Sequence, residues 1–535
     1  MENLTRNHLD VFVVHNPVRV GETNSNIIML ESESWTVFTH SLCLRAIMPT
    51  VLFGLSFVAW TFYHTSCSGQ ALKLPLPPGS LGLPIIGETL SLAFQGCKFF
   101  DERLQRYGSV YKTHLLGSPV IRVCGPENVK KILLSENNLV SVYWPASVRA
   151  LLGDGTVSNA FGNLHRTRRR ALQKAFSHEA LADYVPIMRK VIKDHISIWC
   201  SQDIVHGYQE CKNMAFAVSA ETLVGFNMGI EEHNSSVHLF DVFVDNLFCL
   251  PFRFPGLGFA KGMSARKKLL DKIGESLRVR KLQQDTDHVL PFFQDAISRL
   301  LDVQGEDSLT DSELKDLCLE LLFAGHSTTA SASTSLLLNL IKHRNVLAKI
   351  QEELNSANLG HSEQGDLTMS ALNQMEYISA VVKEVLRLSP PVGGAYRTVL
   401  KTFSLNGYQI PAGWTLAYSI RDTQRISELF PNSSTFDPDR WIDHSSSREE
   451  KFHYLPFGGG TRSCVGKEFA KLFLKIFVIE LVRSCSWRLM NDKVTMNHLP
   501  VPHPADGLPL GFSALEPSLH DLKPIRKTRK TVGTK

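Results

Sequence analysis

The sequence predicts a mainly α-helical fold with a minor β part, preceded by a single N-terminal membrane anchor helix. Three features predict it: an uncharged apolar run over Ala46–Tyr63, long amphipathic stretches between Ser177 and Ser389, and short β-rich runs on either side of those stretches. Apolar residues that recur every three or four positions are typical of helices, whereas strict alternation is typical of strands. We therefore expect one large helical domain that carries a small sheet.

The composition is that of an ordinary folded protein. Of 535 residues, 43% are hydrophobic and 20% are charged, so a large core can be buried. A formal net charge of +5 is small for this length and argues against a nucleic-acid binder. The ten cysteines include no C-x-x-C pair, which suits a domain folded in a reducing compartment.

The run over Ala46–Tyr63 is just long enough to cross a bilayer as a helix, and Trp60 and Tyr63 could lie at its interface. A buried core helix is the alternative, and Pro49 weakens either interpretation. The run starts too far from the N-terminus to be a secretory signal peptide.

Prolines follow the apolar run closely, at Pro75, Pro77 and Pro78. They stiffen the backbone and exclude helix. We expect, in order, a polar and poorly ordered extension at residues 1–45, the anchor helix at 46–63, a proline-rich hinge at 64–87, the catalytic domain at 88–515 and a basic tail at 516–535.

Within the domain, alternating β-rich residues predict a hairpin over 110–115 and 119–123. Residues 311–343 are apolar on more than one face, which indicates one long buried helix. After Pro390 and Pro391 the pattern changes to strands, at 398–405, 409–411 and 414–420, and a final helix is predicted over 467–484.

The strongest chemical signal is the segment 457–466, FGGGTRSCVG. A thiolate beneath a flat macrocycle needs a thin, tightly turned loop, which glycines can supply. A thiolate ligand also pushes electron density toward iron-bound oxygen, which favours O–O cleavage. We therefore interpret Cys464 as an axial ligand of haem iron and Arg462 as a partner of a haem propionate.

This segment resembles the haem-binding signature of the cytochromes P450, F-x-x-G-x-R-x-C-x-G, at every fixed position. The resemblance implies a haem-thiolate monooxygenase that uses haem b and O2, with Cys464 as the iron ligand. It also implies cofactor contacts at Phe457, Gly460, Arg462 and Gly466.

A second landmark of that family is an ion network that follows in the expected order along the chain. Glu384 and Arg387 form an E-x-x-R three residues apart, so their side chains share one face of a helix. Arg440, within the segment FDPDRW, is the expected third member. An isolated E-x-x-R is common on surface helices, but its order and spacing relative to Cys464 favour a structural role in holding the cysteine region.

The segment 324–329, AGHSTT, resembles the oxygen-activation motif of the family, A-G-x-D/E-T-T. Gly325 would leave room for dioxygen, and the Thr328 hydroxyl could pass protons to it. Ser327 replaces the usual acid, so proton delivery is expected to depend on Thr328 and ordered water. Alternatively, the hydroxyls simply bond back to the previous helical turn.

Further haem contacts are expected from basic residues. His165 stands where the family often has Trp, four residues before Arg169, and both could reach propionates. Arg397 is a further expected cofactor contact. The run that contains Arg166 and Arg168 could instead be a solvated face, and we favour a mixture of the two.

The resemblance covers nearly all of residues 74–512 and is strongest to the retinoic-acid hydroxylases, with the third vertebrate member of that family as the nearest match. It is carried by the segments 139–149 LVSVYWPASVR, 246–251 NLFCLP, 328–335 TTASASTS, 391–397 PVGGAYR and 453–460 HYLPFGGG.

This family implies a retinoid substrate, hydroxylated mainly at C4 of its ring, which inactivates retinoic acid and starts its catabolism. An apolar slot for a polyene would be lined by Trp144, Phe248, Phe323, Val392, Gly393 and Tyr396. Arg149 is the candidate partner of the retinoid carboxylate.

No G-x-G-x-x-G fingerprint follows a strand, so NADPH is expected to bind a separate flavoprotein, the NADPH–cytochrome P450 reductase. Lys467, Lys471 and Lys475 recur every four residues and form either a docking face for it or an ordinary solvated face. A retinoic-acid-binding protein could deliver the substrate. The expected location is the endoplasmic reticulum membrane, with the catalytic domain facing the cytosol.

Three alternatives stay open at this point. The chain could oxygenate another lipid or sterol, or rearrange an oxygenated substrate without dioxygen, which Ser327 permits and Thr328 argues against. It could also be a retinoid-binding sink without turnover.

Overall fold

The computed structural model describes residues 48–60, 73–226, 230–285, 295–305, 308–360, 367–442 and 451–515. The chain divides into two compact units, Met1–Ser68 and Gly69–Lys535. The predictions for residues 1–45 and for the basic tail at 516–535 lie outside the described residues.

In the first unit, residues 48–60 form a helix whose apolar side chains, such as Leu55 and Val58, are exposed. Among the residues that the structure describes, no helix is both long and apolar enough to cross a membrane. Both ends of the predicted anchor, residues 46–47 and 61–63, lie outside that part of the chain, so the anchor stays a prediction.

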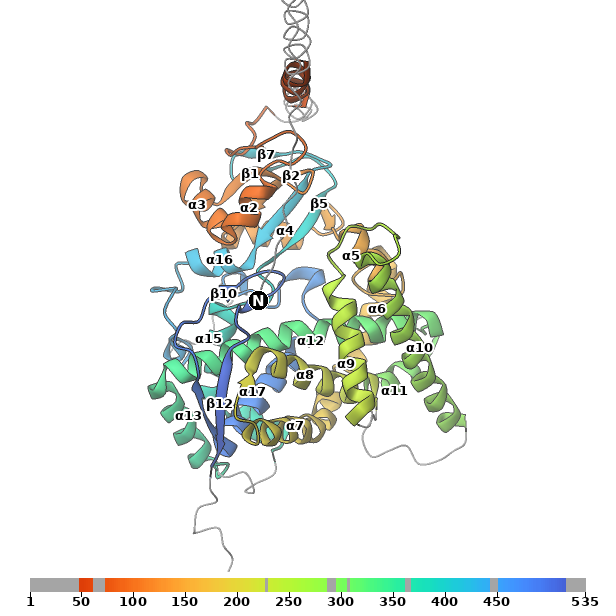
Figure 1. The fold of residues 1–535 in the computed structure, drawn as a ribbon, viewed down its shortest axis with the longest axis vertical. Coiled ribbons are helices and arrows are strands. Elements are labelled where there is room, and N and C mark those ends of the chain that lie inside the picture. The colour runs from red at the N-terminus through yellow and green to blue at the C-terminus, as the bar shows by residue number, and fades with distance from the viewer. Residues whose placement is uncertain are drawn as a thin grey trace, which may run out of the picture. The chain divides into compact units, whose positions relative to one another are not determined.

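The second unit is mainly helical, as predicted (Figure 1). Its α-helices are α2 Thr89–Gln95, α3 Lys98–Tyr107, α4 Pro126–Leu134, α5 Ala146–Leu152, α6 Gly162–Ala175, α7 His178–Cys200, α8 Gly207–Ser219, α9 Ile230–Asp245, α10 Gly258–Asp285, α11 Ala296–Leu301, α12 Asp311–Lys342, α13 Arg344–Ser356, α14 Met369–Gln374, α15 Glu376–Leu388, α16 Ile420–Ile426 and α17 Lys467–Ser484. A π-helix, η1 Ala220–Val224, extends α8, and two 3₁₀-helices are η3 Pro438–Trp441 and η5 Gly460–Arg462.

The minor β part is built around a five-stranded sheet in the order β1-β2-β8-β5-β3, in which only β2 and β8 are parallel. The predicted hairpin is its edge, with Val110 opposite Val123. The strands are β1 Val110–Leu115, β2 Ser118–Val123, β3 Val140–Val142, β4 Val205–His206, β5 Gly394–Val399, β6 Phe403–Leu405, β7 Tyr408–Ile410, β8 Thr415–Ser419, β9 Cys485–Leu489, β10 Met496–Asn497, β11 His503–Pro504 and β12 Pro509–Ala514.

The prediction of one strand over 398–405 was wrong, because β5 ends at Val399 and β6 begins at Phe403. The Leu400 N–H still donates to the Leu139 carbonyl next to β3, 2.8 Å away, and it is the last residue of this stretch that is bonded to the large sheet. The chain therefore leaves the large sheet here and starts the separate β6–β7 hairpin.

The long helix predicted over 311–343 is α12, which crosses the unit between the strand-rich part and helices α7, α8 and α17 (Figure 1). Its start is fixed by a capping box: the Thr310 hydroxyl accepts from the Glu313 N–H, and the Glu313 carboxylate accepts from the Thr310 N–H, 3.0 Å away. Most of its side chains are buried, so α12 is the element on which the other helices pack.

Candidate haem-thiolate active site

The Cys464 loop is held by its own backbone and by α4. The Cys464 N–H donates to the Phe457 carbonyl at 2.9 Å. Gly460 has a φ of +67°, and a Cβ there would lie 2.2 Å from the carbonyl oxygen of Leu133 in α4. Glycine is therefore required at this position both by conformation and by space.

Cys464 is exposed on this loop. Burial of the thiol by neighbouring protein atoms raises its pKa above the ordinary value. The Gly466 N–H and the charges of Arg169 and Lys467 act in the opposite direction and only reduce this rise. A thiol in such a place becomes a stable thiolate when a cation binds it, since a coordinating metal deprotonates a thiol outright. The donor chemistry thus fits an iron ligand.

Two of the predicted haem contacts share one carboxylate. Glu136 accepts from Arg462 Nε at 3.3 Å and pairs with Arg397 Nε at 3.0 Å. Arg462 also donates to the carbonyls of Val157 and Ala160, at 3.2 and 2.8 Å. Glu136 was missed by sequence reasoning, yet it orients both guanidinium groups.

The other two basic residues that were predicted to contact haem, His165 and Arg169, lie on α6. Arg169 donates to the Ser463 carbonyl at 2.8 Å and to its hydroxyl at 3.1 Å, directly beside Cys464. His165 is buried, and its Nε2 has no hydrogen-bond partner among the described residues. Burial, together with the positive charge of Arg462 and then of Arg169, lowers the pKa of His165 to about 4, so its ring is neutral at pH 7.

These basic residues leave an excess of positive charge near Cys464. Among the described ion pairs, the guanidinium groups of Arg169, Arg397 and Arg462 face only the one carboxylate of Glu136. Two positive charges therefore remain, which matches the two propionates of haem b. Arg168 does not belong to this set: it is buried and pairs with Glu313 at 2.9 Å, so the view of it as a solvated residue was wrong.

The predicted oxygen-activation segment lies in the middle of α12. The Thr328 hydroxyl is partly exposed and donates to the Ala324 carbonyl at 2.6 Å, which is the back-bonding alternative. Its oxygen can still accept a hydrogen bond. A Cβ on Gly325 would lie 2.5 Å from the Ser219 hydroxyl of α8, so this glycine lets two helices approach each other rather than making room on the exposed side.

Sequence reasoning missed His326. Its ring is fully buried, and its Nδ1 lies 3.0 Å from the hydroxyl of Ser327, the residue that replaces the usual acid. Burial, and then the charge of Lys212, lower the pKa of His326 to about 3, against an opposing effect of Asp241. The only signal in the sequence was a histidine inside a helix that was predicted to be buried.

The predicted ion network is confirmed and is larger than expected. Glu384 is fully buried and accepts from Arg387 Nε at 2.8 Å, Arg387 Nη2 at 2.9 Å and Arg440 Nε at 3.1 Å. The Trp441 indole and the Asp437 N–H donate to the same carboxylate at 2.9 and 3.0 Å. All of its hydrogen-bonding capacity is therefore used.

This network is connected to the Cys464 loop. The amide of Gln424 donates to the Arg387 carbonyl and accepts from the Leu455 N–H, both at 2.8 Å. The Tyr454 hydroxyl donates to the Lys383 carbonyl at 3.1 Å, and its ring packs on Trp441. The start of the cysteine loop is thus tied to α15 at two points.

A row of carboxylates on α12 holds the segment 153–158, which follows α5. The Glu320 carboxylate accepts from the Val157 and Ser158 N–H groups at 2.7 and 2.8 Å, and Asp316 accepts from the Gly155 N–H at 3.0 Å. These acids recur at helical spacing, so they lie on one face of the helix. All three contacts are made to backbone atoms of the segment.

The predicted substrate residues lie on several elements. Trp144 and Phe323 are partly buried against the core. Val392, Gly393 and Tyr396 are exposed around the start of β5, and Arg149 is exposed on α5. Phe248 lies on the segment between α9 and α10 and is 56% exposed. Their contact with substrate stays a prediction.

Of the three lysines predicted to form a docking face, Lys467, Lys471 and Lys475, the last is partly buried. Lys467 and Lys471 are paired with Glu468 at 3.7 and 3.2 Å, while Lys475 donates to the Leu372 carbonyl at 3.0 Å. Burial lowers the pKa of Lys475, and its ammonium already binds a backbone carbonyl of this chain, so it offers a partner less than an exposed lysine would.

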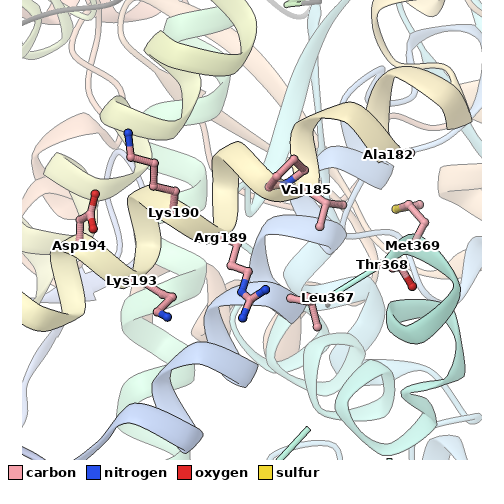
Figure 2. Close-up of a pocket in the computed structure, with 10 residues that line it drawn as sticks. Ala182, Val185, Arg189, Lys190, Lys193, Asp194, Leu367, Thr368 and Met369 are labelled. Carbon is pink, nitrogen blue, oxygen red and sulfur yellow. The ribbon is translucent and has the colours of Figure 1, made fainter. Parts of the chain in front are cut away.

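A separate hollow of about 630 Å³ lies between α7 and residues 367–369 (Figure 2). Basic side chains line it on the α7 side, and one of them, Arg189, binds Glu480 at 3.0 Å. None of the predicted site residues lines this hollow.

The chain matches the family model described as Cytochrome P450 over residues 77–505. It is 42% identical to Cytochrome P450 26B1 of Mus musculus and of Homo sapiens, covering 91% of this chain and 96% of each relative. It is also 42% identical to Cytochrome P450 26A1 of Gallus gallus, covering 87% and 96%. A solved structure, retinoic acid bound cyanobacterial CYP120A1, matches with a TM-score of 0.75 at 33% identity, covering 83% of this chain and all of that one.

Taken with the Cys464 loop and its cationic surround, these matches show that the chain belongs to the cytochrome P450 family. Membership implies a haem iron with a thiolate ligand, dioxygen as oxidant and electrons from a reductase. Within the family the chain is similar to the P450 26 relatives from several vertebrates. A closer likeness to the third vertebrate member of the retinoic-acid hydroxylases stays a prediction.

Replacing Glu384 with Ala should lower the free energy of unfolding by roughly 3–5 kcal/mol, because Arg387 and Arg440 would be left as uncompensated charges in a buried place. Urea-induced unfolding followed by circular dichroism measures this. Glu468→Ala is the matched control, since its partners Lys467 and Lys471 are exposed and such pairs contribute about 0–1 kcal/mol. Equal losses in both variants would contradict the role assigned to the network.

Stability should depend on His326 at acid pH. Its folded pKa of about 3 lies below the ordinary value of 6.5, so the unfolded chain binds a proton that the folded protein excludes. Stability therefore falls as pH drops from about 6.5 toward 3, by about 1.4 kcal/mol per pH unit from this residue. In His326→Phe, the free energy of unfolding should fall less steeply with decreasing pH, by that amount per pH unit. Equal slopes in the two proteins between pH 6.5 and 3 would refute this prediction.

Proposed function

We propose that the chain is a haem-thiolate monooxygenase that hydroxylates all-trans retinoic acid, mainly at C4 of the ring, and so begins retinoid catabolism. The observation that carries the reaction class is Cys464, exposed on a glycine loop beside Arg169 and next to an excess of two positive charges. The substrate class is supported by the resemblance to retinoic-acid hydroxylases and by the similarity to the retinoic acid bound cyanobacterial structure.

The bound haem would supply oxygen activation at iron. The protein's own residues prepare that chemistry. Arg397, Arg462 and Arg169 would hold the propionates, and neutral His165 would offer its partnerless Nε2 as a further contact. The Gly466 N–H, which contacts the Cys464 sulfur, would tune the ligand's basicity.

A retinoid would occupy the side of α12 on which Ala324 and Thr328 are exposed. The exposed side chains of Val392 and Tyr396 and the partly buried ring of Phe323 offer apolar contacts to a polyene. The carboxylate at the other end of the substrate would be bound by Arg149. These side chains orient the ring rather than take part in bond breaking.

We further propose that the protein lies in the endoplasmic reticulum membrane, with the catalytic domain in the cytosol, where the NADPH–cytochrome P450 reductase supplies electrons. The uncharged run at 46–63 and the exposed apolar side chains of residues 48–58 support a membrane anchor. A retinoic-acid-binding protein is the proposed carrier of the substrate.

The first experiment is a reduced, CO-bound difference spectrum, followed by titration with all-trans retinoic acid. We expect a thiolate-type Soret band that is lost in Cys464→Ala, and a high-spin shift on addition of the acid. Turnover with NADPH and reductase, with the product identified by mass spectrometry, should give a ring-hydroxylated acid. A thiolate band without a shift would refute the retinoid assignment, and binding without product would favour a sink.

Arg149→Ala should weaken the binding of retinoic acid at least about fivefold, or about 1 kcal/mol, while the binding of retinol changes little, because only the acid carries a carboxylate. The spectral titration measures both ligands. Arg278→Ala, which removes another exposed guanidinium on α10, is the control. Equal losses for acid and alcohol would show that Arg149 does not bind the carboxylate.

A further inference from the structure

The buried ring of His326 lies between Asp241 of α9 and Ser327 of α12, and it also packs against aromatic side chains. Its ring packs edge-on against Phe240 of α9 and Phe216 of α8, with centroids 5.0 and 6.3 Å away. Within this apolar surround, Nδ1 lies 3.0 Å from the Ser327 hydroxyl, and Nε2 has no hydrogen-bond partner among the described residues. A buried ring nitrogen without a hydrogen bond destabilises the folded protein, so its presence calls for a role besides packing.

The group that faces Nε2 is a carboxylate that reaches the surface. Asp241 Oδ1, on α9, lies 3.9 Å from His326 Nε2 and 2.6 Å from the ammonium of Lys212 on α8. Their side chains are 21% and 14% exposed, whereas the side chain of His326 is 0% exposed. The four groups therefore form a line from the outside of the α8–α9 layer to the middle of α12.

We propose that Asp241, His326 and Ser327 form a proton path from solvent to the exposed Ala324–Thr328 face of α12, in place of the acid that Ser327 has replaced, and that Lys212 holds Asp241 at its outer end. His326 is the only member that can both accept and donate through two separate nitrogens. The proposal rests on the proposed monooxygenase function, because that reaction consumes protons on this side of α12.

The proton balance of the path is simple. A proton from solvent reaches the Asp241 carboxylate and passes to Nε2, either after a small rotation or through one water across the 3.9 Å gap. The imidazole then releases its other proton from Nδ1 to the Ser327 oxygen, and the hydroxyl proton of Ser327 passes to a water molecule on the Ala324–Thr328 face of α12. A proton has entered and a proton has left, and a change of tautomer returns the ring to its starting state.

Other charged groups face the outer end of this line. Asp245 lies one turn further along α9, where burial raises its pKa, and Lys212 opposes that effect. Tyr208 of α8 also feels the charges of Asp241 and Asp245, and burial raises its pKa to about 12. Among the contacts of the described residues, neither group touches the His326 ring, so Asp245 supplies a matched control on the same helix.

The first test is made on the resting holoenzyme, without turnover. With histidines labelled by ¹⁵N, the His326 ring signal is assigned by its absence from His326→Phe. A proton path predicts that the ring proton exchanges with water although the side chain is fully buried. Asp241→Asn should slow this exchange at least about tenfold, whereas Asp245→Asn should leave it unchanged. Equal rates in all three proteins would overturn the proposal.

The second test uses turnover with retinoic acid. His326→Phe keeps the ring packing but cannot carry a proton, so the product formed per NADPH consumed should fall at least about tenfold and the solvent deuterium effect should rise. Substrate binding, read from the spectral shift, should not change. A purely structural role predicts unchanged coupling, and that result would also overturn the path.

The two tests separate the two proposals. If the wild-type protein gives no product from retinoic acid, the proposed substrate fails, but the exchange measurement still decides whether a proton path exists. If product forms normally in His326→Phe and exchange is insensitive to Asp241, the path fails and the monooxygenase function stands.

Discussion

A single buried carboxylate, that of Glu384, sets the conditions for the rest of the site. Burying a charge is costly unless all of its hydrogen-bonding capacity is used, and here guanidinium, indole and backbone N–H donors converge on it. The segments that provide those donors have no freedom to move independently. Through Gln424 and Tyr454 the same constraint reaches the residues that begin the Cys464 loop. The position of the sulfur therefore depends in part on a carboxylate of α15.

The sequence was sufficient wherever the requirement is local. The Cys464 loop could be predicted because glycine, arginine and cysteine must stand at fixed places within ten residues to make a turn under a macrocycle. The Glu384–Arg387 pair could be predicted because helical spacing alone brings the two side chains together. The long helix α12 and the β1–β2 hairpin followed from hydrophobic periodicity in the same way.

Interactions between distant parts of the chain left no such pattern. Glu136 lies 326 positions before Arg462, and nothing in its own neighbourhood marks it as the partner of two haem-side arginines. A second E-x-x-R, formed by Glu480 and Arg483, is just as buried as the predicted one, so spacing alone could not tell the two apart. The sequence also did not show which neighbour Gly325 faces. It faces α8, and this depends on how the two helices pack and not on the motif that contains the glycine.

The hold of α12 on the segment 153–158 has a consequence for how this protein can change. The carboxylates of Asp316 and Glu320 bind the backbone N–H groups of Gly155, Val157 and Ser158, and Arg462 binds the backbone carbonyl of Val157. An anchor made to the main chain is indifferent to most side chains it carries. A residue such as Val157, which is held through its backbone N–H and carbonyl, can therefore be exchanged through evolution while the loop keeps its course. The course of this segment can therefore outlast part of its sequence.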